Sequence, residues 1–221
     1  MRLVLFDCDG TLVDSAALIH EVMVRTFAAF DLAAPVIAET KAIIGLTLDI
    51  AIARLLGQPH VNDRALAMTA HYKSIFAGVR QEPGFEEALF PGIGPLVAAL
   101  SRRPGLKIGA VTGKSRRGLQ LIAGRHGFDT VFSISRTADD CPSKPHPAMV
   151  IECCEGLGIA PRDTVVVGDA VYDMQMAKAA GAAALGVAWG YAPVPALVEA
   201  GADHIARTPQ DIHDWLELQH A

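Results

Sequence analysis

The sequence of 221 residues has no excess of positive charge, no long apolar run and few aromatic side chains. It carries 19 Lys and Arg against 24 Asp and Glu, a net charge of −5, and its basic residues are scattered. Proteins that bind nucleic acid concentrate basic residues on one surface, so we expect no nucleic-acid partner. No apolar stretch has the length of a membrane span, and no basic-then-apolar leader opens the chain. We therefore expect a cytoplasmic protein without a membrane partner.

Cysteine is also sparse, and its spacing excludes the usual zinc sites. The four cysteines, Cys8, Cys141, Cys153 and Cys154, match no zinc-ligand pattern, and we expect free thiols in a reducing cytosol. Hydrophobic residues make up 51% of the chain. That share is enough for one large domain, or for one domain plus a smaller one.

A short acidic string near the start of the chain carries the first sign of chemistry. Asp7 and Asp9 follow an apolar run, residues 2–6, that indicates a buried strand. Residues i and i+2 of an extended segment point the same way, and two such carboxylates repel each other unless a cation lies nearby. One could be a nucleophile and the other a general acid and base. Gly10 permits a tight turn and the close approach of a ligand. An Asp-Gly turn by itself would mean little.

Two patterns divide the rest of the chain. Apolar residues recur at helical spacing between about residues 15 and 85, with no convincing strand, so this segment is a helical insert. Within it, residues 45–47 interrupt the helices and could form a loop over a site. Strands and helices then alternate, which predicts an α/β fold with a Rossmann-like parallel sheet covered by helices on both faces. We expect one domain of residues 1–14 and 86–221, which contains the sheet, and an inserted helical domain of residues 15–85.

Each chemically suggestive string follows a predicted strand. Thr112, Gly113 and Lys114 follow the strand at residues 106–111, Lys144 follows the next, and Asp169 and Asp173 follow the apolar run at residues 164–167. Parallel strands end at one edge of the sheet, so these strings should converge there with Asp7 and Asp9.

This ordered set resembles the haloacid dehalogenase-like superfamily, in the branch with a helical cap inserted after the first strand. The resemblance extends over the whole chain and implies roles for the residues that match. Asp7 would be the nucleophile and Asp9 the acid and base, while Thr112 and Lys144 would hold the phosphoryl group. Mg²⁺ would be bound by Asp7, the backbone carbonyl of Asp9 and Asp169, with Asp173 close behind. The remaining candidate substrate contacts are Cys8, Gly10, Gly113 and Lys114.

Some positions differ from the family pattern or leave alternatives open. Gly113 stands where the family often has Asn, which keeps a backbone donor and loses a side-chain contact. Ala170 stands where Thr or Ser is usual. Lys114 could be a second phosphate contact or a surface residue.

The hypothesis that accounts for all these motifs is that the protein is a magnesium-dependent phosphatase. It would hydrolyse a small phosphate monoester, phosphoglycolate-like or a sugar phosphate, through an aspartyl-phosphate. One alternative is a phosphomutase of the β-phosphoglucomutase type, which Ile19 disfavours because that group has a histidine there. Another is a non-catalytic, phosphate-binding regulatory protein. The expected partner is a small phosphorylated metabolite, and the protein would be a monomer or a homodimer.

Overall fold

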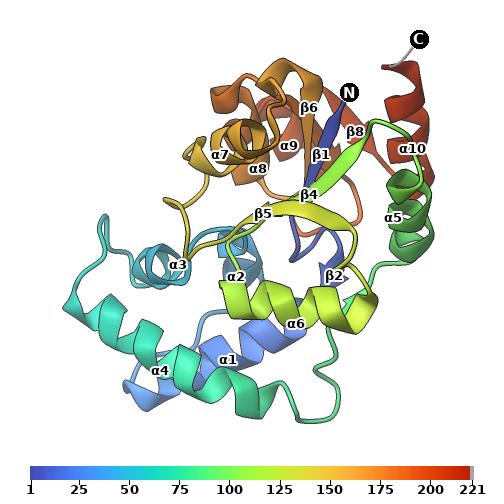
Figure 1. Cartoon of the computed structure of the whole chain (residues 1–221). Coiled ribbons are helices and arrows are strands. Elements are labelled where there is room, and N and C mark those ends of the chain that lie inside the picture. The colour runs from blue at the N-terminus through green and yellow to red at the C-terminus, as the bar shows by residue number, and fades with distance from the viewer. Residues whose placement is uncertain (220–221) are drawn as a thin grey trace.

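A six-stranded sheet forms the centre of the computed structural model, which describes residues 1–219 (Figure 1). Its strands pair in parallel, in the order β5-β4-β1-β6-β7-β8. The strands are β1 (Leu3–Phe6), β4 (Lys107–Val111), β5 (Phe132–Arg136), β6 (Thr164–Gly168), β7 (Ala183–Val187) and β8 (His204–Ala206).

The central position of β1 follows from its composition. All four residues of β1 are apolar and buried, as expected for a strand covered on both faces. Leu3 lies opposite Lys107 of β4 on one side and Thr164 of β6 on the other. The carboxyl ends of β1, β4 and β6 therefore lie side by side, and the α/β prediction is confirmed.

Helices cover both faces of this sheet. Alternate residues of β1 point to opposite faces, and each set packs against a different group of helices. Val4 and Phe6 belong to an apolar cluster with residues of α5, α6 and α10, whereas Leu3 and Leu5 belong to another with residues of α7, α8 and α9. These helices are α5 (Ile93–Ser101), α6 (Arg116–His126), α7 (Ala148–Leu157), α8 (Val171–Ala180), α9 (Val194–Glu199) and α10 (Pro209–Leu218), and a short 3₁₀ turn, Pro161–Asp163, precedes β6.

Four helices that come between β1 and β4 in the sequence share a hydrophobic cluster of their own. They are α1 (Ala16–Ala29), α2 (Ile37–Ile43), α3 (Leu48–Leu55) and α4 (Asp63–Val79), and Figure 1 shows them beyond one edge of the sheet. Met23, Ile52 and Met68, from three of these helices, are fully buried in the cluster. At the start of α4, Asn62 Oδ1 accepts a hydrogen bond from the Ala65 N–H at 2.9 Å.

The chain enters and leaves these four helices through two short paired segments. β2 (Val13–Asp14) and β3 (Ala88–Leu89) form an antiparallel two-stranded ribbon. Two residues a strand are too few to give an alternating pattern, so the sequence did not predict this ribbon. It brings the two chain crossings between the helices and the sheet next to each other.

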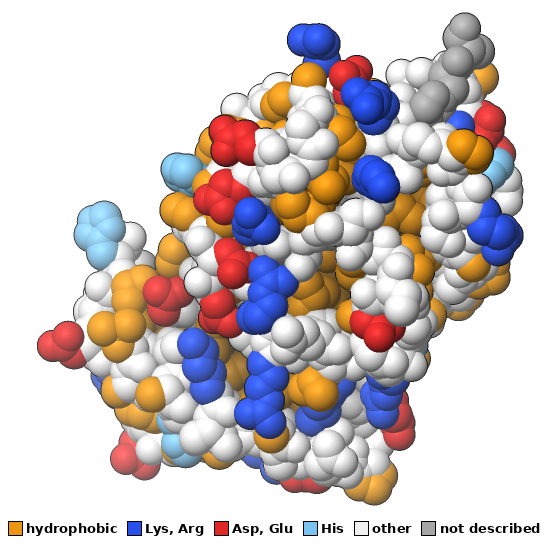
Figure 2. All heavy atoms as spheres, in the orientation of Figure 1, with side chains coloured by type: hydrophobic (Ala, Val, Ile, Leu, Met, Phe, Trp, Pro, Cys, Tyr) orange, Lys and Arg blue, Asp and Glu red, His pale blue; other side chains and the backbone are white. Residues whose placement is uncertain are grey.

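The surface agrees with the scattered charge of the sequence. Figure 2 shows Lys and Arg side chains mixed with Asp and Glu on the visible face. Within residues 1–219, no helix is both long and apolar enough to cross a bilayer.

Candidate active site

A buried ammonium group joins two carboxylates at the carboxyl edge of the sheet. Lys144, in the loop between β5 and α7, places Nζ 2.6 Å from Asp7 Oδ1 and 2.6 Å from Asp173 Oδ1. All three side chains are buried. Burial alone would lower the pKa of Lys144, but the attraction of Asp173 and Asp7 outweighs it and raises the pKa above its usual value. Lys144 is therefore held as a cation between the two acids.

Asp169 completes an acidic group with Asp7 and Asp173. It follows β6, and its Oδ1 accepts a hydrogen bond from Thr11 Oγ1 at 3.0 Å while Oδ2 accepts one from the Tyr191 N–H at 2.8 Å. One oxygen from each of the three carboxylates lies within 4.8 Å of the other two, so together they could bind a metal ion. Asp7 Oδ2 is buried and has no hydrogen-bond partner in the described part of the chain.

The charge of this acidic group fits a divalent cation. Three buried carboxylates face one buried ammonium group. Burial, followed by repulsion from neighbouring carboxylates, raises the pKa of Asp169 well above its usual value, and burial raises the pKa of Asp7 to about 7. A divalent cation would balance the excess negative charge and occupy the free oxygen of Asp7. Carboxylate oxygens are also the donors that Mg²⁺ and similar hard cations prefer.

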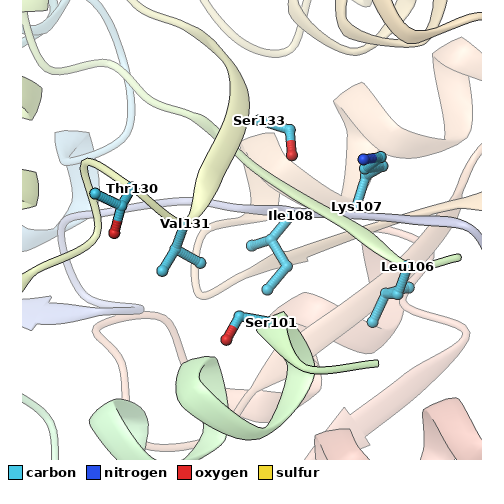
Figure 3. Close-up of a pocket in the computed structure, with 7 residues that line it drawn as sticks. All are labelled: Ser101, Leu106, Lys107, Ile108, Thr130, Val131 and Ser133. Atoms are coloured by element: carbon cyan, nitrogen blue, oxygen red, sulfur yellow. The ribbon is translucent and has the colours of Figure 1, made fainter. Parts of the chain in front are cut away.

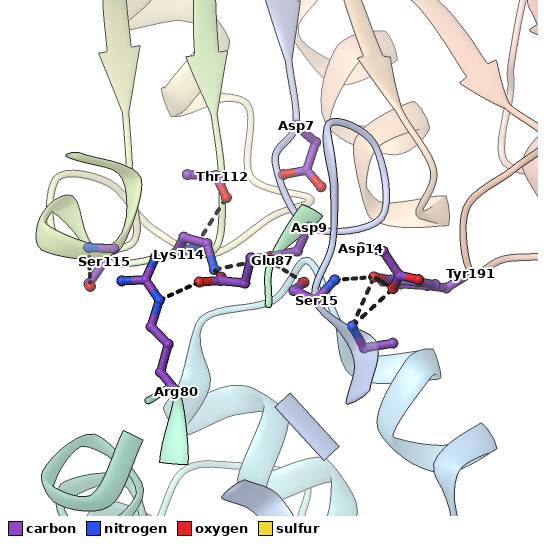
Figure 4. Close-up of polar contacts among 12 residues, drawn as sticks. Asp7, Asp9, Asp14, Ser15, Arg80, Glu87, Thr112, Lys114, Ser115 and Tyr191 are labelled. Atoms are coloured by element: carbon purple, nitrogen blue, oxygen red, sulfur yellow. Dashed lines mark hydrogen bonds and ion pairs between the residues drawn. The ribbon is translucent and has the colours of Figure 1, made fainter. Parts of the chain in front are cut away.

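The Asp9 side chain points away from that acidic group. Its Oδ1 accepts a hydrogen bond from Ser15 Oγ at 2.6 Å and pairs with Lys114 Nζ at 2.8 Å (Figure 4). The metal role expected for Asp9 therefore rests on its backbone carbonyl, and the carboxylate remains available for proton transfer. The Lys114 side chain is only 9% exposed, so the interpretation of Lys114 as a surface residue is wrong.

The turn after β4 lies against the four-helix segment. Thr112 is fully buried, and its Oγ1 accepts a hydrogen bond from the Lys114 N–H at 3.2 Å. A Cβ atom on Gly113 would lie 2.5 Å from the Leu46 carbonyl oxygen and 2.7 Å from that of Gly45. The structure thus explains why glycine stands where the family often has asparagine: no side chain fits under this loop.

Further contacts join the four helices to the loops of the site. The N–H of Thr47, the last residue of the loop at residues 45–47, donates to Ser143 Oγ at 2.9 Å, and Ser143 directly precedes Lys144 in the sequence. Tyr172, in the first turn of α8, donates through its hydroxyl to the Ala42 carbonyl at 3.1 Å. The loop at residues 45–47 therefore reaches the site, as the sequence suggested.

The two remaining candidate contacts, Cys8 and Gly10, have only backbone groups to present to a ligand. The Cys8 side chain is buried in the apolar cluster of the sheet, so only its backbone can face a ligand. The Gly10 N–H donates to the Val13 carbonyl at 2.9 Å, and a Cβ atom on Gly10 would lie 2.3 Å from Asp169 Oδ2. Gly10 therefore lets the first turn approach Asp169 closely, and its contact with a substrate stays a prediction.

Sequence reasoning missed several polar residues around Asp9. Ser15 directly precedes α1, and its hydroxyl binds Asp9 instead of capping the backbone of that helix. Glu87 is 1% exposed and pairs with Lys114 (2.9 Å) and Arg80 (2.7 Å). The Tyr191 hydroxyl accepts hydrogen bonds from the Ser15 and Ala16 N–H groups. Tyr191 could have been found from its position after β7, whereas Glu87 gives no such signal.

The sheet has a separate hollow near its opposite edge. This hollow has a volume of about 390 Å³ and lies at the beginnings of β4 and β5 (Figure 3). It is lined by Ser101, Leu106, Lys107, Ile108, Thr130, Val131 and Ser133. Lys107 begins β4, whereas Thr112 follows its end. The hollow therefore does not belong to the candidate active site.

Comparison with known proteins places this geometry in a family. The model of the haloacid dehalogenase-like hydrolases matches residues 1–181. The phosphoglycolate phosphatase of Escherichia coli (strain K12) is 31% identical over 244 aligned residues, which cover 100% of this chain and 94% of that protein. A phosphoglycolate phosphatase of Yersinia pestis is 32% identical over 195 residues, covering 86% and 82%. Among solved structures, the haloacid dehalogenase-like family protein SP0104 from Streptococcus pneumoniae superposes with a TM-score of 0.82 at 25% identity, with 98% of each chain covered.

Proposed function

Because this chain belongs to the haloacid dehalogenase-like hydrolases, we propose that it is a phosphatase that hydrolyses a small phosphate monoester through a phosphorylated Asp7. Relatives named phosphoglycolate phosphatase, matched along the whole chain, support a phosphoric monoester as substrate. Phosphoglycolate or a sugar phosphate is the substrate class that we propose.

The observation that carries this proposal is the state of the Asp7 carboxylate. One oxygen is held by Lys144, and the other is buried without a partner in the described residues. A buried polar atom without a partner is costly, so it indicates a ligand. Asp7, Asp169, Asp173 and the Asp9 carbonyl would hold Mg²⁺. When bound, this cation would neutralise the repulsion between the carboxylate and the phosphate dianion.

The chain's own groups can carry both halves of the reaction. Asp7 attacks phosphorus, the bond to the ester oxygen breaks, and Asp9 donates its proton to that oxygen. Asp9, now ionised, takes a proton from a water molecule that attacks the aspartyl-phosphate, which releases phosphate and restores both carboxyl groups. Lys144 and Thr112 would hold the phosphoryl oxygens, together with backbone N–H groups at Cys8 and Gly113.

Activity assays with two kinds of substituted enzyme test this assignment. Asp7→Asn nearly conserves volume and removes the nucleophile, so turnover of an alkyl phosphate should fall at least about 10³-fold. Asp9→Asn should slow the alkyl ester by about 10²- to 10⁴-fold and a nitrophenyl ester much less, because nitrophenolate leaves without a proton. Excess EDTA should abolish activity, and Mg²⁺ should restore it. Near-normal turnover by folded Asp7→Asn would refute the assignment.

The identity of the product separates the two alternatives. A phosphatase releases inorganic phosphate from a panel of phosphorylated metabolites, whereas a phosphomutase isomerises a sugar phosphate faster than it releases phosphate. A regulatory protein would bind a phosphate ester and turn over none of the panel.

We also propose that residues 15–85 are a cap domain that closes over the phosphorylated Asp7. Hinges near Asp14 and Gly84 would let the cap move, and closure would exclude stray water. The contact between Thr47 and Ser143 offers a test, since cysteines at both positions could lock the cap to the core. The oxidised double variant should lose turnover and regain it on reduction. Full-speed turnover by the oxidised protein would show that the cap is no lid.

A further inference from the structure

A line of alternating charges runs from the four-helix segment to Asp9. Arg80 Nε lies 2.7 Å from Glu87 Oε2, Glu87 Oε1 lies 2.9 Å from Lys114 Nζ, and Lys114 Nζ lies 2.8 Å from Asp9 Oδ1 (Figure 4). The side chains of Glu87 and Lys114 are 2% and 9% exposed. Each charge in this line therefore has an opposite charge as its neighbour, largely shielded from solvent.

The line begins at the second crossing between cap and core, and the first crossing contacts its other end at Asp9. Arg80 is the C-cap residue that follows α4, and Glu87 immediately precedes β3 on the second crossing. Ser15, on the first crossing, donates its hydroxyl to Asp9 at 2.6 Å. The backbone carbonyl of Glu87 is held as well, because His126 Nε2 lies 3.0 Å from it at the end of α6. The position of Asp9 thus depends on groups at both hinges.

Glu87 fixes the position of the Lys114 ammonium group. The ammonium lies between the carboxylates of Glu87 and Asp9, at nearly equal distances from both. Without Glu87, one side of this ammonium group would be empty, and Arg80 would lose its carboxylate partner. Buried polar networks hold one arrangement when every member is satisfied and lose it when one is removed.

We propose that Glu87 is a positioning residue that aims Asp9 at the leaving oxygen through Lys114 and ties this alignment to the end of α4 through Arg80. Asp9 then points at the leaving oxygen only when the second crossing, which contains Glu87, is packed against the core. Glu87 itself does not touch the reacting atoms. This inference rests on the proposed function, because it assumes that Asp9 protonates the leaving group.

Leaving-group dependence tests the proposal. Glu87→Gln keeps the shape of the side chain and removes its charge. For an alkyl phosphate, kcat should fall about 10- to 100-fold, a part of the full effect of a general acid. For a nitrophenyl phosphate, kcat should fall less than about 3-fold, since that leaving group needs little protonation. KM should change little for both esters. A merely structural role would lower both rates together.

Glu82→Gln is the matched control. Glu82 also pairs with an arginine of the cap, Arg25, at 2.7 Å, but its side chain is 42% exposed. It lies on the same crossing as Glu87 and has no contact with Lys114 or Asp9, so both ester rates should stay at the wild-type level.

A second variant keeps the proposal testable if circular dichroism shows that Glu87→Gln does not fold. Glu87→Asp retains the charge and is one methylene shorter, so it cannot reach Lys114 and Arg80 together. It should show the same selective loss on the alkyl ester. Equal losses on both esters, or no loss in a folded variant, would overturn the inference and leave the phosphatase assignment intact. A wild-type protein that hydrolyses neither ester would instead overturn the proposed function, and this inference with it.

Discussion

Removing the ammonium group of Lys144 should destabilise the metal-free protein strongly. Lys144→Met keeps a long unbranched side chain and leaves Asp7 and Asp173 buried without the cation that lies 2.6 Å from each. Breaking a buried ion pair by deleting one partner costs about 3–5 kcal/mol in the free energy of unfolding. At about 2–4 °C per kcal/mol for a chain of this size, Tm should fall by about 6–20 °C.

Calorimetry in EDTA and with Mg²⁺ measures this effect. Divalent cation should restore part of the loss, since a ligand at 100 times its Kd stabilises the folded state by about 2.7 kcal/mol. The loss of stability of Lys144→Met relative to the wild type should also depend on pH. In the folded protein, burial raises the pKa of Asp7 to about 7, so between about pH 4 and 7 the folded state holds a proton that the unfolded state has released. Stability of the metal-free protein therefore falls as pH rises through this window, and the deficit of Lys144→Met should be larger at pH 8 than at pH 5.

Lys178→Met is the control for this experiment. Lys178 also pairs with an aspartate, Asp203 at 2.7 Å, but its side chain is 47% exposed. An exposed pair of this kind contributes less than about 1 kcal/mol. Equal Tm changes in Lys178→Met and Lys144→Met, or an unchanged Tm in Lys144→Met in EDTA, would refute the reasoning.

Three further changes have defined outcomes. Gly113→Ala places a Cβ atom 2.5 Å from the Leu46 carbonyl oxygen, so the loop at residues 45–47 must shift, and kcat/KM should fall about 10- to 100-fold while the circular dichroism spectrum is kept. Burial alone would raise the pKa of Asp140, but hydrogen bonds from Thr137 lower it below its usual value, so its stabilisation is present above about pH 4 and lost in more acidic solution. The Tm difference between wild type and Asp140→Asn should accordingly shrink from pH 6 to pH 3, and a constant difference would contradict this. Ca²⁺ should support less turnover than Mg²⁺, because it favours longer bonds and more ligands; equal rates would argue against an octahedral site.

The sheet and the acidic group were predictable because they follow from local patterns. The unbroken β-branched run Val165–Val167 indicates a strand buried on both faces, and β6 lies there. The rule that parallel strands end at one edge then brought Asp7, Lys144 and Asp169 together, although as many as 162 positions of sequence separate them (169 − 7).

The polar line to Asp9 was not predictable, because nothing local distinguishes its members. Glu86 and Glu87 are adjacent acids in the sequence, yet Glu86 is exposed and Glu87 is buried. Only the packing of α4 and of the turn after β4 selects Glu87. Lys114 was undecided for the same reason, since a lysine at the start of a helix is compatible with solvent or with a buried carboxylate.

The strand order also determines when β1 can pair with its neighbours during synthesis. β1 leaves the ribosome first, but both of its neighbours, β4 and β6, begin more than 100 residues later, at Lys107 and Thr164. At about 5–20 residues per second, roughly 5–20 s pass before β1 can pair with β4. Helices α1 to α4 share one hydrophobic cluster and can pack against each other during that interval, so the apolar segment Leu3–Phe6 stays unpaired next to helices that have already packed. A nascent chain that stops before residue 164 lacks β6 and the aspartates that follow it, so it carries Asp7 without Asp169 and Asp173, the two other members of the acidic group.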